Sequence, residues 1–148
     1  MLTIDINDLA TVAPADLGYS RWIEIDQTRI DAFAEVSEDH QWIHTDPARA
    51  AEGPFGQTIA HGYLTLSLIS ALIDDLFSVT GQSAAVNYGL NRVRFPAPVL
   101  VGSRVRAHGA IRRVSPKNSG LEVLVDIAVI AEEQDKPACV AEVLFLIR

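Results

Sequence analysis

The chain has 148 residues, of which 49% are hydrophobic and 21% charged, and its formal net charge at pH 7 is −7. This size predicts one domain over residues 1–148 with a real core. The negative charge argues against a nucleic-acid partner, because phosphate contacts need clustered Lys and Arg. A single cysteine, Cys139, permits no internal disulfide, and the N-terminus has no basic or apolar run of a targeting peptide, so we expect a cytoplasmic protein.

The N-terminal quarter of the chain predicts strands and then a helix. A short strand is expected at Leu2–Ile6, with a loop after it through Pro14. Ser20–Asp26 alternates in polarity, as a strand does. Asp26 or Thr28 is placed to cap a helix over residues 27–37.

A polar loop and a buried helix come next. Residues 38–46 are read as the loop, Pro47–Ala51 as a short helix with proline at its first position, and residues 52–60 as a second loop. The segment from Gly62 to about Ser78 is apolar on nearly every side, which is typical of a buried helix. It is too short and too polar at its flanks to span a membrane, so no membrane partner is expected.

The remainder of the chain predicts four long strands. Their expected ranges are 84–95, 99–115, 121–132 and 137–147, with turns at residues 115–120 and 133–136. Long neighbouring strands joined by short turns favour an antiparallel meander. Because the helix must be covered on all sides, we expect an α+β protein in which a curved antiparallel sheet wraps one long buried helix.

Asp39 and His44 stand five residues apart in the polar loop. Trp42 and Ile43 between them are expected to hold the loop against the core. Alone, the pair is best read as solvated loop residues. Addition of water nevertheless requires this chemistry, because two groups must hold one water while a proton is removed and a proton is returned.

Gly62 begins the buried helix, where backbone N–H groups lack intrahelical partners. It is either a glycine required by tight packing or, as we favour, a residue whose N–H polarises a substrate carbonyl as an oxyanion hole does. His61 is read as a structural residue that caps or buttresses this turn. Ser70, two helical turns on, fits a serine bonded to the preceding turn as well as one near a substrate.

Other chemistries find less support. His40 and His44 are four residues apart, but the zinc-protease pattern H-E-x-x-H needs a glutamate where Gln41 stands, so we expect no metal, even with His61 as a conceivable third ligand. Cys139 lies in an apolar context and reads as core. No glycine-rich nucleotide motif and no G-x-S-x-G occur, so no cofactor is expected.

Three motifs carry a family resemblance. The stretch D-H-Q-W-I-H at residues 39–44, followed by Ala50, resembles the signature of the MaoC-like (R)-specific enoyl-CoA hydratases and dehydratases. I-A-H-G at residues 59–62 and R-F-P-A-P-V at residues 94–99, with Gly102, resemble the second and third hallmarks in the same order. Glu38, Gln41 and Trp42 depart from the usual Gly, Asn and Pro, and the Q-W-I-H variant is most similar to the nodulation-protein-N-like branch.

The resemblance implies a hot-dog fold and a homodimer in which sheet edges pair. It also implies hydration of trans-2-enoyl-CoA to (R)-3-hydroxyacyl-CoA, or the reverse dehydration, with Asp39, His44 and Gly62 as catalytic residues. The substrate would be an acyl-CoA thioester, in which coenzyme A is part of the substrate rather than a cofactor. Two alternatives stay open: a hot-dog thioesterase that directs water at the carbonyl, and a non-catalytic acyl-CoA-binding module.

Arg92 and Arg94 alternate with Val93 and Phe95, so both point to one face of their strand. They are candidates to contact the coenzyme A phosphates, although solvated surface arginines are the commoner case. Residues near them that can line a pocket are Tyr88 and Asn91.

Overall fold

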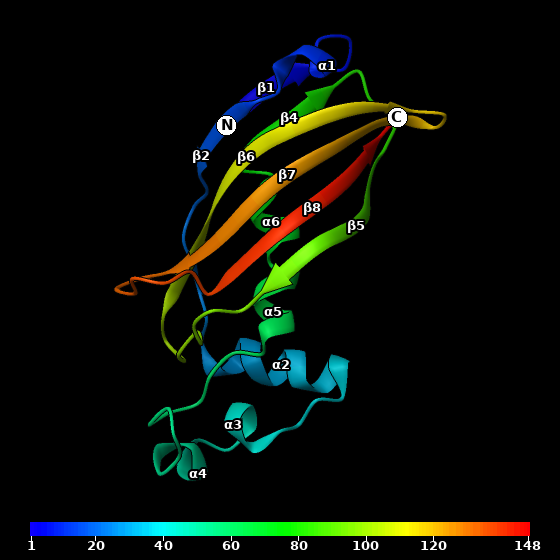
Figure 1. Ribbon diagram of the computed structural model, residues 1–148. Helices are drawn as coiled ribbons and strands as arrows, with labels where there is room; N and C mark the ends of the chain where they lie inside the picture. Colours follow the sequence, from blue (N-terminus) through cyan, green and yellow to red (C-terminus); the bar gives the residue numbers. More distant parts are fainter.

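The computed structural model describes residues 1–148. Its elements in chain order are β1 (Leu2–Asp5), α1 (Leu9–Val12), β2 (Ala15–Tyr19), β3 (Ile23–Glu24), α2 (Gln27–Ser37), α3 (Trp42–Thr45), α4 (Pro47–Ala51), α5 (Gly62–Ser67), α6 (Ile69–Ile73), β4 (Phe77–Thr80), β5 (Ala85–Arg94), β6 (Arg104–Lys117), β7 (Gly120–Ala131) and β8 (Cys139–Ile147). Figure 1 shows α5 and α6 in line behind a curved sheet, with α2, α3 and α4 as a separate group beyond one end of it. None of these helices is both long and apolar enough to cross a membrane.

The large sheet is an antiparallel meander. Its strand order is β2-β6-β7-β8-β5, and β3 also pairs with β6. All of these pairs are antiparallel. Alternate residues of β7, such as Val123, Val125 and Ile127, are buried and join the core formed with α5 and α6. The α+β prediction is therefore confirmed, with β5 at the edge and only β8 as its neighbour.

The buried helix begins at Gly62 as predicted but is shorter and interrupted. It breaks at Leu68 and ends at Ile73, not near Ser78. At the break, the Ser67 hydroxyl donates to the Leu64 carbonyl oxygen at 2.8 Å, a local bond that competes with the helical ladder. Beyond it, β4 pairs in parallel with β1, so the end of the predicted helix is a strand.

The prediction that the helix is enclosed on all sides is wrong for one face of this chain. Side chains at helical spacing along α5 and α6 are exposed, namely Tyr63, Ser67, Ser70 and Asp74. They lie on the side of α5 and α6 where the sheet ends at β5, since hollows beside this face are lined by Ser67, Ser70 and residues of β5.

Several strand limits also differ from the predictions. β6 begins at Arg104 rather than Val99, because residues 99–103 form a turn closed by the Ser103 N–H donating to the Leu100 carbonyl. β6 then runs to Lys117, so the expected turn at residues 115–120 shrinks to the two residues before β7. The helix over residues 27–37 and the short helix Pro47–Ala51 are confirmed.

The N-terminal predictions are partly right. Leu2–Asp5 is a strand, but Ser20–Asp26 contributes only β3. α1 lies in the segment predicted as loop, and β2 lies between that loop and Ser20, where no element is predicted. β2 pairs with β6 through a register shift between Asp16 and Gly18, and Gly18 has a φ of +71°. That irregularity hides the two-residue alternation by which a strand is recognised.

Candidate active site

Helix α2 directs the chain into the site. Its N-cap is Asp26, whose carboxylate accepts from the Arg29 N–H at 2.8 Å, as the sequence predicts. Its last turn ends at Glu38, which adopts the left-handed conformation with φ 59° and ψ 19°. The family resemblance has glycine at this position, and glycine adopts this conformation without strain. The reversal at Glu38 leads directly to Asp39.

The polar loop of residues 38–46 is partly helical, which corrects its prediction as loop. Its residues 42–45 form α3, and this turn places His44 towards the core. Gln27 holds the turn in place, because its amide Nε2 donates to the His44 carbonyl at 2.8 Å while its Oε1 accepts from the Thr58 hydroxyl. The Ile59 N–H also donates to the Ile43 carbonyl at 3.0 Å. Backbone and side-chain bonds thus join α2, α3 and the segment before α5.

The His44 ring is buried and its tautomer is defined by its surroundings. Its side chain is 6% exposed, and Nδ1 lies 2.7 Å from the Ile59 carbonyl oxygen. Because a carbonyl only accepts, Nδ1 carries the hydrogen and Nε2 is left with a free lone pair. Burial lowers the pKa of His44 and His61 lowers it further, against the raising effects of the Ile59 carbonyl and Asp39. The neutral ring can accept a proton at Nε2.

Asp39, His44 and His61 lie together. One carboxylate oxygen of Asp39 and one ring nitrogen of each histidine all lie within 4.8 Å of one another. Asp39 itself is exposed, and its carboxylate accepts from the Gln41 N–H at 3.3 Å. The structure therefore brings the two predicted catalytic side chains together. It gives the pair a third member, His61, for which the sequence suggested only a role at the turn.

These three groups have the residue types of a metal site, but the orientation of the rings opposes one. The His44 and His61 rings stack with centroids 3.8 Å apart and planes 24° apart. Imidazole binds a metal through a lone pair in the ring plane. Lone pairs in two nearly parallel, stacked planes do not converge on one ion. His40 lies outside the cluster, with its Nδ1 3.6 Å from a Glu35 carboxylate oxygen.

Gly62 and His44 line the same cavity, of about 270 Å³. The R-F-P-A-P-V segment supplies a further part of the lining with Phe95, Pro96, Ala97, Pro98 and Val99. The Phe95 ring lies against Gly62, and a Cβ added there would come within 3.1 to 3.2 Å of ring carbons. A side chain at position 62 would therefore press on the Phe95 ring, so the glycine lets that ring pack closely at the start of α5.

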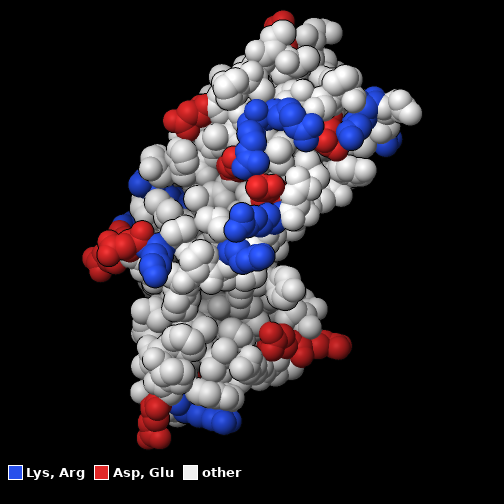
Figure 2. All heavy atoms as spheres, viewed as in Figure 1, with Lys and Arg blue, Asp and Glu red and all other residues white.

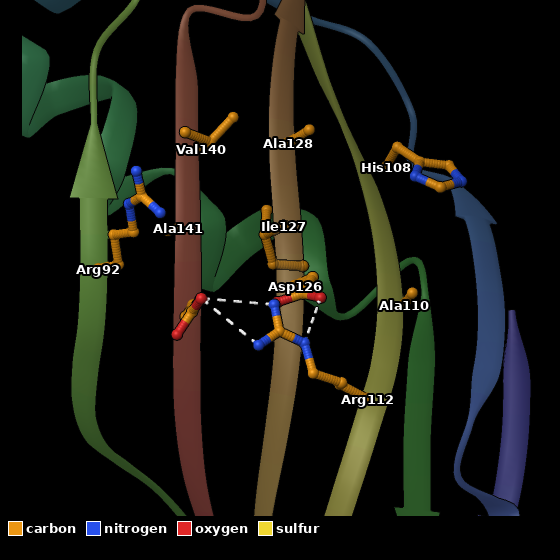
Figure 3. Close-up of a pocket in the computed structure, with 10 residues that line it drawn as sticks. Arg92, His108, Ala110, Arg112, Asp126, Ile127, Ala128, Val140 and Ala141 are labelled. Carbon is orange, nitrogen blue, oxygen red and sulfur yellow. Dashed lines mark hydrogen bonds and ion pairs between the residues drawn. The ribbon is translucent and has the colours of Figure 1, made fainter.

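Arg92 and Arg94 lie at the end of β5 that leads to this wall. Both are exposed, and Arg94 Nη1 donates to the Val93 carbonyl at 2.7 Å. Arg92 lines a separate hollow of about 440 Å³ on the outer face of the sheet, beside the ion pairs of Arg112 with Asp126 and Glu142 (Figure 3). Most basic side chains on the viewed face lie over the sheet (Figure 2).

Ser70, a candidate position near the substrate, lies beside the open helix face. Asn87 Nδ2 lies 3.5 Å from the Ser70 hydroxyl, and both residues line two adjoining hollows of about 330 and 260 Å³. Tyr88 and Asn91 are exposed on β5 and line none of the four main hollows. Cys139 is fully buried, as predicted, and burial raises the pKa of its thiol to about 11, which makes it a poor nucleophile.

Comparison with known proteins identifies the family. Residues 9–133 match the family model described as MaoC like domain. The chain belongs to the MaoC-like dehydratase family. A MaoC-like relative from Mycobacterium tuberculosis, named 3-hydroxyacyl-thioester dehydratase Z, is 50% identical over 138 residues, covering 93% of this chain and 91% of the relative. Nodulation protein N from Rhizobium leguminosarum is 41% identical over 151 residues, covering 100% and 94%. The predicted resemblance, including its nodulation-protein-N-like branch, is confirmed.

A solved MaoC-like structure agrees. The R-hydratase PhaJ1 from Pseudomonas aeruginosa superposes with a TM-score of 0.74 at 28% identity, covering 88% of this chain and 81% of that one. The hot-dog fold predicted from the resemblance is confirmed. Because its relatives are named dehydratases and hydratases, this MaoC-like protein is a hydro-lyase, a hydratase or dehydratase.

Sequence reasoning missed the residues that hold the site together. Gln27, Thr58 and Phe95 are not identified as site residues by the sequence. The predicted capping role of His61 is not observed, because its side chain makes no hydrogen bond to the first turn of α5. Gln27 and Thr58 are 31 residues apart, and no local pattern links them. The His61 signal was present, since its imidazole sits in the second motif directly before Gly62.

Proposed function

We propose that this protein adds water to trans-2-enoyl-CoA to give (R)-3-hydroxyacyl-CoA, or catalyses the reverse dehydration. The observation that carries the proposal is the neutral, buried His44 ring, with its Nε2 free, beside the Asp39 carboxylate and in the same cavity as Gly62. Asp39, His44 and Gly62 are the catalytic residues of this scheme. No cofactor takes part, since coenzyme A belongs to the substrate.

The spacing suits a shared water. Two hydrogen bonds of about 2.8 Å that meet at a water oxygen join atoms roughly 4.5 Å apart. The Asp39 oxygen and the His44 nitrogen lie within 4.8 Å. An ionised carboxylate and the His44 Nε2 both accept, so one water can donate to each. Its oxygen lone pairs are then free to attack carbon.

The reaction then runs with atoms and electrons in balance. The water oxygen forms a bond to C3 of the enoyl thioester, the C2–C3 π electrons form a C1–C2 π bond, and the carbonyl π electrons move onto the thioester carbonyl oxygen. When C2 is protonated, this carbonyl forms again. One water proton passes to Asp39 or His44, and a proton is returned from the pair to C2. Gly62 N–H stabilises the negative oxygen that forms meanwhile. Because both groups lie on one side of the substrate, the addition is syn.

Arg92 and Arg94 are proposed to contact the coenzyme A phosphates. Both are exposed cations near the end of β5, and Arg94 directly precedes Phe95 of the cavity lining, whereas Arg92 lines the separate hollow on the sheet. Along the chain, Arg94 is nearer than Arg92 to Phe95, where the cavity lining begins. Exposed arginines can reach phosphate oxygens through several donors at once.

The protein is proposed to act as a homodimer of single domains, each spanning residues 1–148, in the cytoplasm. Strand β5 pairs only with β8, and its other edge is free. Exposed apolar side chains lie along it, namely Val86, Tyr88 and Leu90. A long free edge of this kind is usually covered. A second copy paired at β5 would also cover the adjacent open face of α5 and α6.

The proposal is tested with a panel of trans-2-enoyl-CoA thioesters. Loss of the conjugated double bond is followed separately from release of free thiol, and the product is analysed on a chiral column. Hydration without thiol release, giving mainly the (R) alcohol, is expected. Thiol release alone would favour the thioesterase, binding without turnover would favour the acyl-CoA-binding module, and an (S) product would exclude this mechanism.

A further inference from the structure

Two histidines lie face to face at the centre of the site. The His44 and His61 rings have centroids 3.8 Å apart, and only 6% and 2% of the two residues is exposed. The Phe33 ring of α2 also packs on His61, with centroids 5.0 Å apart. His61 is therefore in contact both with α2 and with the histidine proposed to bind the water.

Each ring has one hydrogen-bonded nitrogen, and its partner is a backbone carbonyl. His44 Nδ1 is 2.7 Å from the Ile59 oxygen, and His61 Nε2 is 2.9 Å from the Asp39 oxygen. Carbonyls only accept, so both of these nitrogens carry hydrogen. His61 Nδ1 is buried and has no hydrogen-bond partner.

His61 connects the two groups that are proposed to share the water. Its Nε2–H anchors the backbone of Asp39, while the face of its ring supports His44. Asp39 and His61 are the titratable groups that face the His44 ring. The other walls of the His44 cavity, including Phe55 and the segment 95–99, offer no charged side chain.

We propose that His61 is a positioning residue with two separable tasks. The face of its ring shields the His44 ring from water, and because burial disfavours the charged imidazolium this keeps His44 neutral with its Nε2 lone pair available to the substrate water. Its Nε2–H holds the backbone of Asp39 in register with that lone pair. This inference rests on the proposed hydratase function. Because the two tasks use different parts of one side chain, different substitutions remove them one at a time.

Two variants separate the tasks. His61→Phe keeps a ring against His44 but cannot donate to the Asp39 carbonyl, so kcat should fall about 100-fold, as misplacement of a reacting group by about 1 Å can cause. The acidic limb of kcat/KM should stay in place. His61→Gln keeps an amide donor but loses the ring, so His44 should take up a proton at higher pH. The acidic limb of the kcat/KM profile then moves to higher pH, and at pH values above that limb kcat falls less than in His61→Phe.

The decisive measurement is made without substrate. The protonation midpoint of His44 is read from its Cε1–H signal by NMR, with the four histidines assigned by single substitutions. The midpoint should rise in His61→Gln and stay in place in His61→Phe. His40→Gln, at an exposed histidine, is the matched control and should change neither midpoint nor kcat.

Two results would overturn the inference. If both variants keep the wild-type midpoint and kcat, His61 is only a core residue. If His61→Phe moves the midpoint as far as His61→Gln, the ring does not hold His44 neutral. If His61→Phe does not fold, His61→Met, which fills the space without a donor, replaces it, and His61→Asn replaces His61→Gln in the same way. If the wild-type protein has no hydratase activity, the proposed function is wrong. The NMR titration of His44 would still test whether the His61 ring controls its protonation.

Discussion

At the scale of single residues, Asp39 and His44 are expected to act as one unit. If both hold the same water, losing either removes the arrangement, so the two losses should not add. Asp39→Asn and His44→Ala should each lower hydratase turnover by roughly 10²–10⁴-fold, and the double variant should be little worse. Neither variant should recover activity with zinc. Turnover of the purified proteins is the measurement, with circular dichroism as the folding control.

Two matched substitutions test whether the loss is local. His40→Ala removes an imidazole four residues from His44, and Asp135→Asn changes a carboxylate in the turn before β8. Both should retain wild-type turnover. A folded Asp39→Asn variant with near wild-type activity would show that Asp39 is not catalytic, and the thioesterase and binding-module alternatives would then move ahead.

Gly62 offers a second test at residue scale. In Gly62→Ala, the new Cβ would lie 3.1 to 3.2 Å from the Phe95 ring, where the thioester is also proposed to approach. We expect turnover to fall roughly 10- to 100-fold, less than the loss of a whole oxyanion donor, because the N–H remains. The protein should still fold, since Phe95 is partly exposed and can move.

The contact with Phe95 gives this substitution two possible causes of damage. Adding Phe95→Ala removes the ring that the new methyl group meets. If Gly62→Ala acts by blocking the thioester, the double variant stays slow relative to Phe95→Ala alone. Recovery to the Phe95→Ala rate would mean that the methyl group acted only by displacing the ring. Unchanged turnover in Gly62→Ala would place the carbonyl elsewhere.

Sequence reasoning could anticipate that Asp39 and His44 lie near each other, because both belong to one local motif. Asp39 and His44 are five residues apart, and a loop followed by a short helix brings them together. The contacts of Gln27 with His44 and Thr58 arise only when α2 packs beside the segment before α5. Such contacts depend on tertiary packing, so the hydrogen bonds of Gln27 with His44 and Thr58 are visible only in the structure.

At the scale of elements, the end of α2 carries a strained residue. Glu38 holds a φ of 59° in the C-cap, a conformation that costs a residue with a Cβ roughly 1–2 kcal/mol. Glycine adopts it freely but gains entropy in the unfolded chain, which offsets part of the benefit. Glu38→Gly should therefore raise the free energy of unfolding by about 0.5–1 kcal/mol, measured by denaturant titration.

The same substitution three residues earlier serves as its control. Glu35 lies inside α2, where glycine lacks the helical preference of other residues. Glu35→Gly should therefore lower the free energy of unfolding by about 1 kcal/mol. Opposite signs at the two positions are the expected result. If Glu38→Gly is as destabilising as Glu35→Gly, strain at the cap is not what limits α2.

The end of the central helix shows why element limits are harder to predict than element types. After Asp74 and Asp75, Leu76 and Phe77 resume the apolar character of α6, so composition alone extends the helix. Val79 and Phe77 are buried while Ser78 and Thr80 are more exposed, an alternation of period two that fits a strand. The partner that makes it a strand, β1, lies more than seventy residues away in the sequence.

At the scale of the whole molecule, the pattern of long alternating strands was sufficient to predict the sheet. Segments rich in Val, Ile and Leu with short polar turns gave β5 to β8 nearly in place. What the pattern could not show is that the sheet leaves one helical face open, with Ser67, Ser70 and Asp74 exposed. The apolar character of the segment predicts a helix buried on every side, whereas these polar residues mark the side that the sheet of one chain does not reach.

That open side and the free edge of β5 lead to the last prediction, a homodimer formed edge to edge. Lysine on a strand edge prevents pairing with another edge, because its charge would have to be buried. Leu90→Lys combined with Val86→Lys should therefore convert the dimer to a monomer in light scattering. Val36→Lys, which changes an equally apolar exposed residue on α2, should leave the dimer intact. Turnover should fall with dissociation, since hollows lined by Ser70 and Asn87 would lose their cover. A wild-type protein that is monomeric and active at low concentration would contradict the proposed dimer.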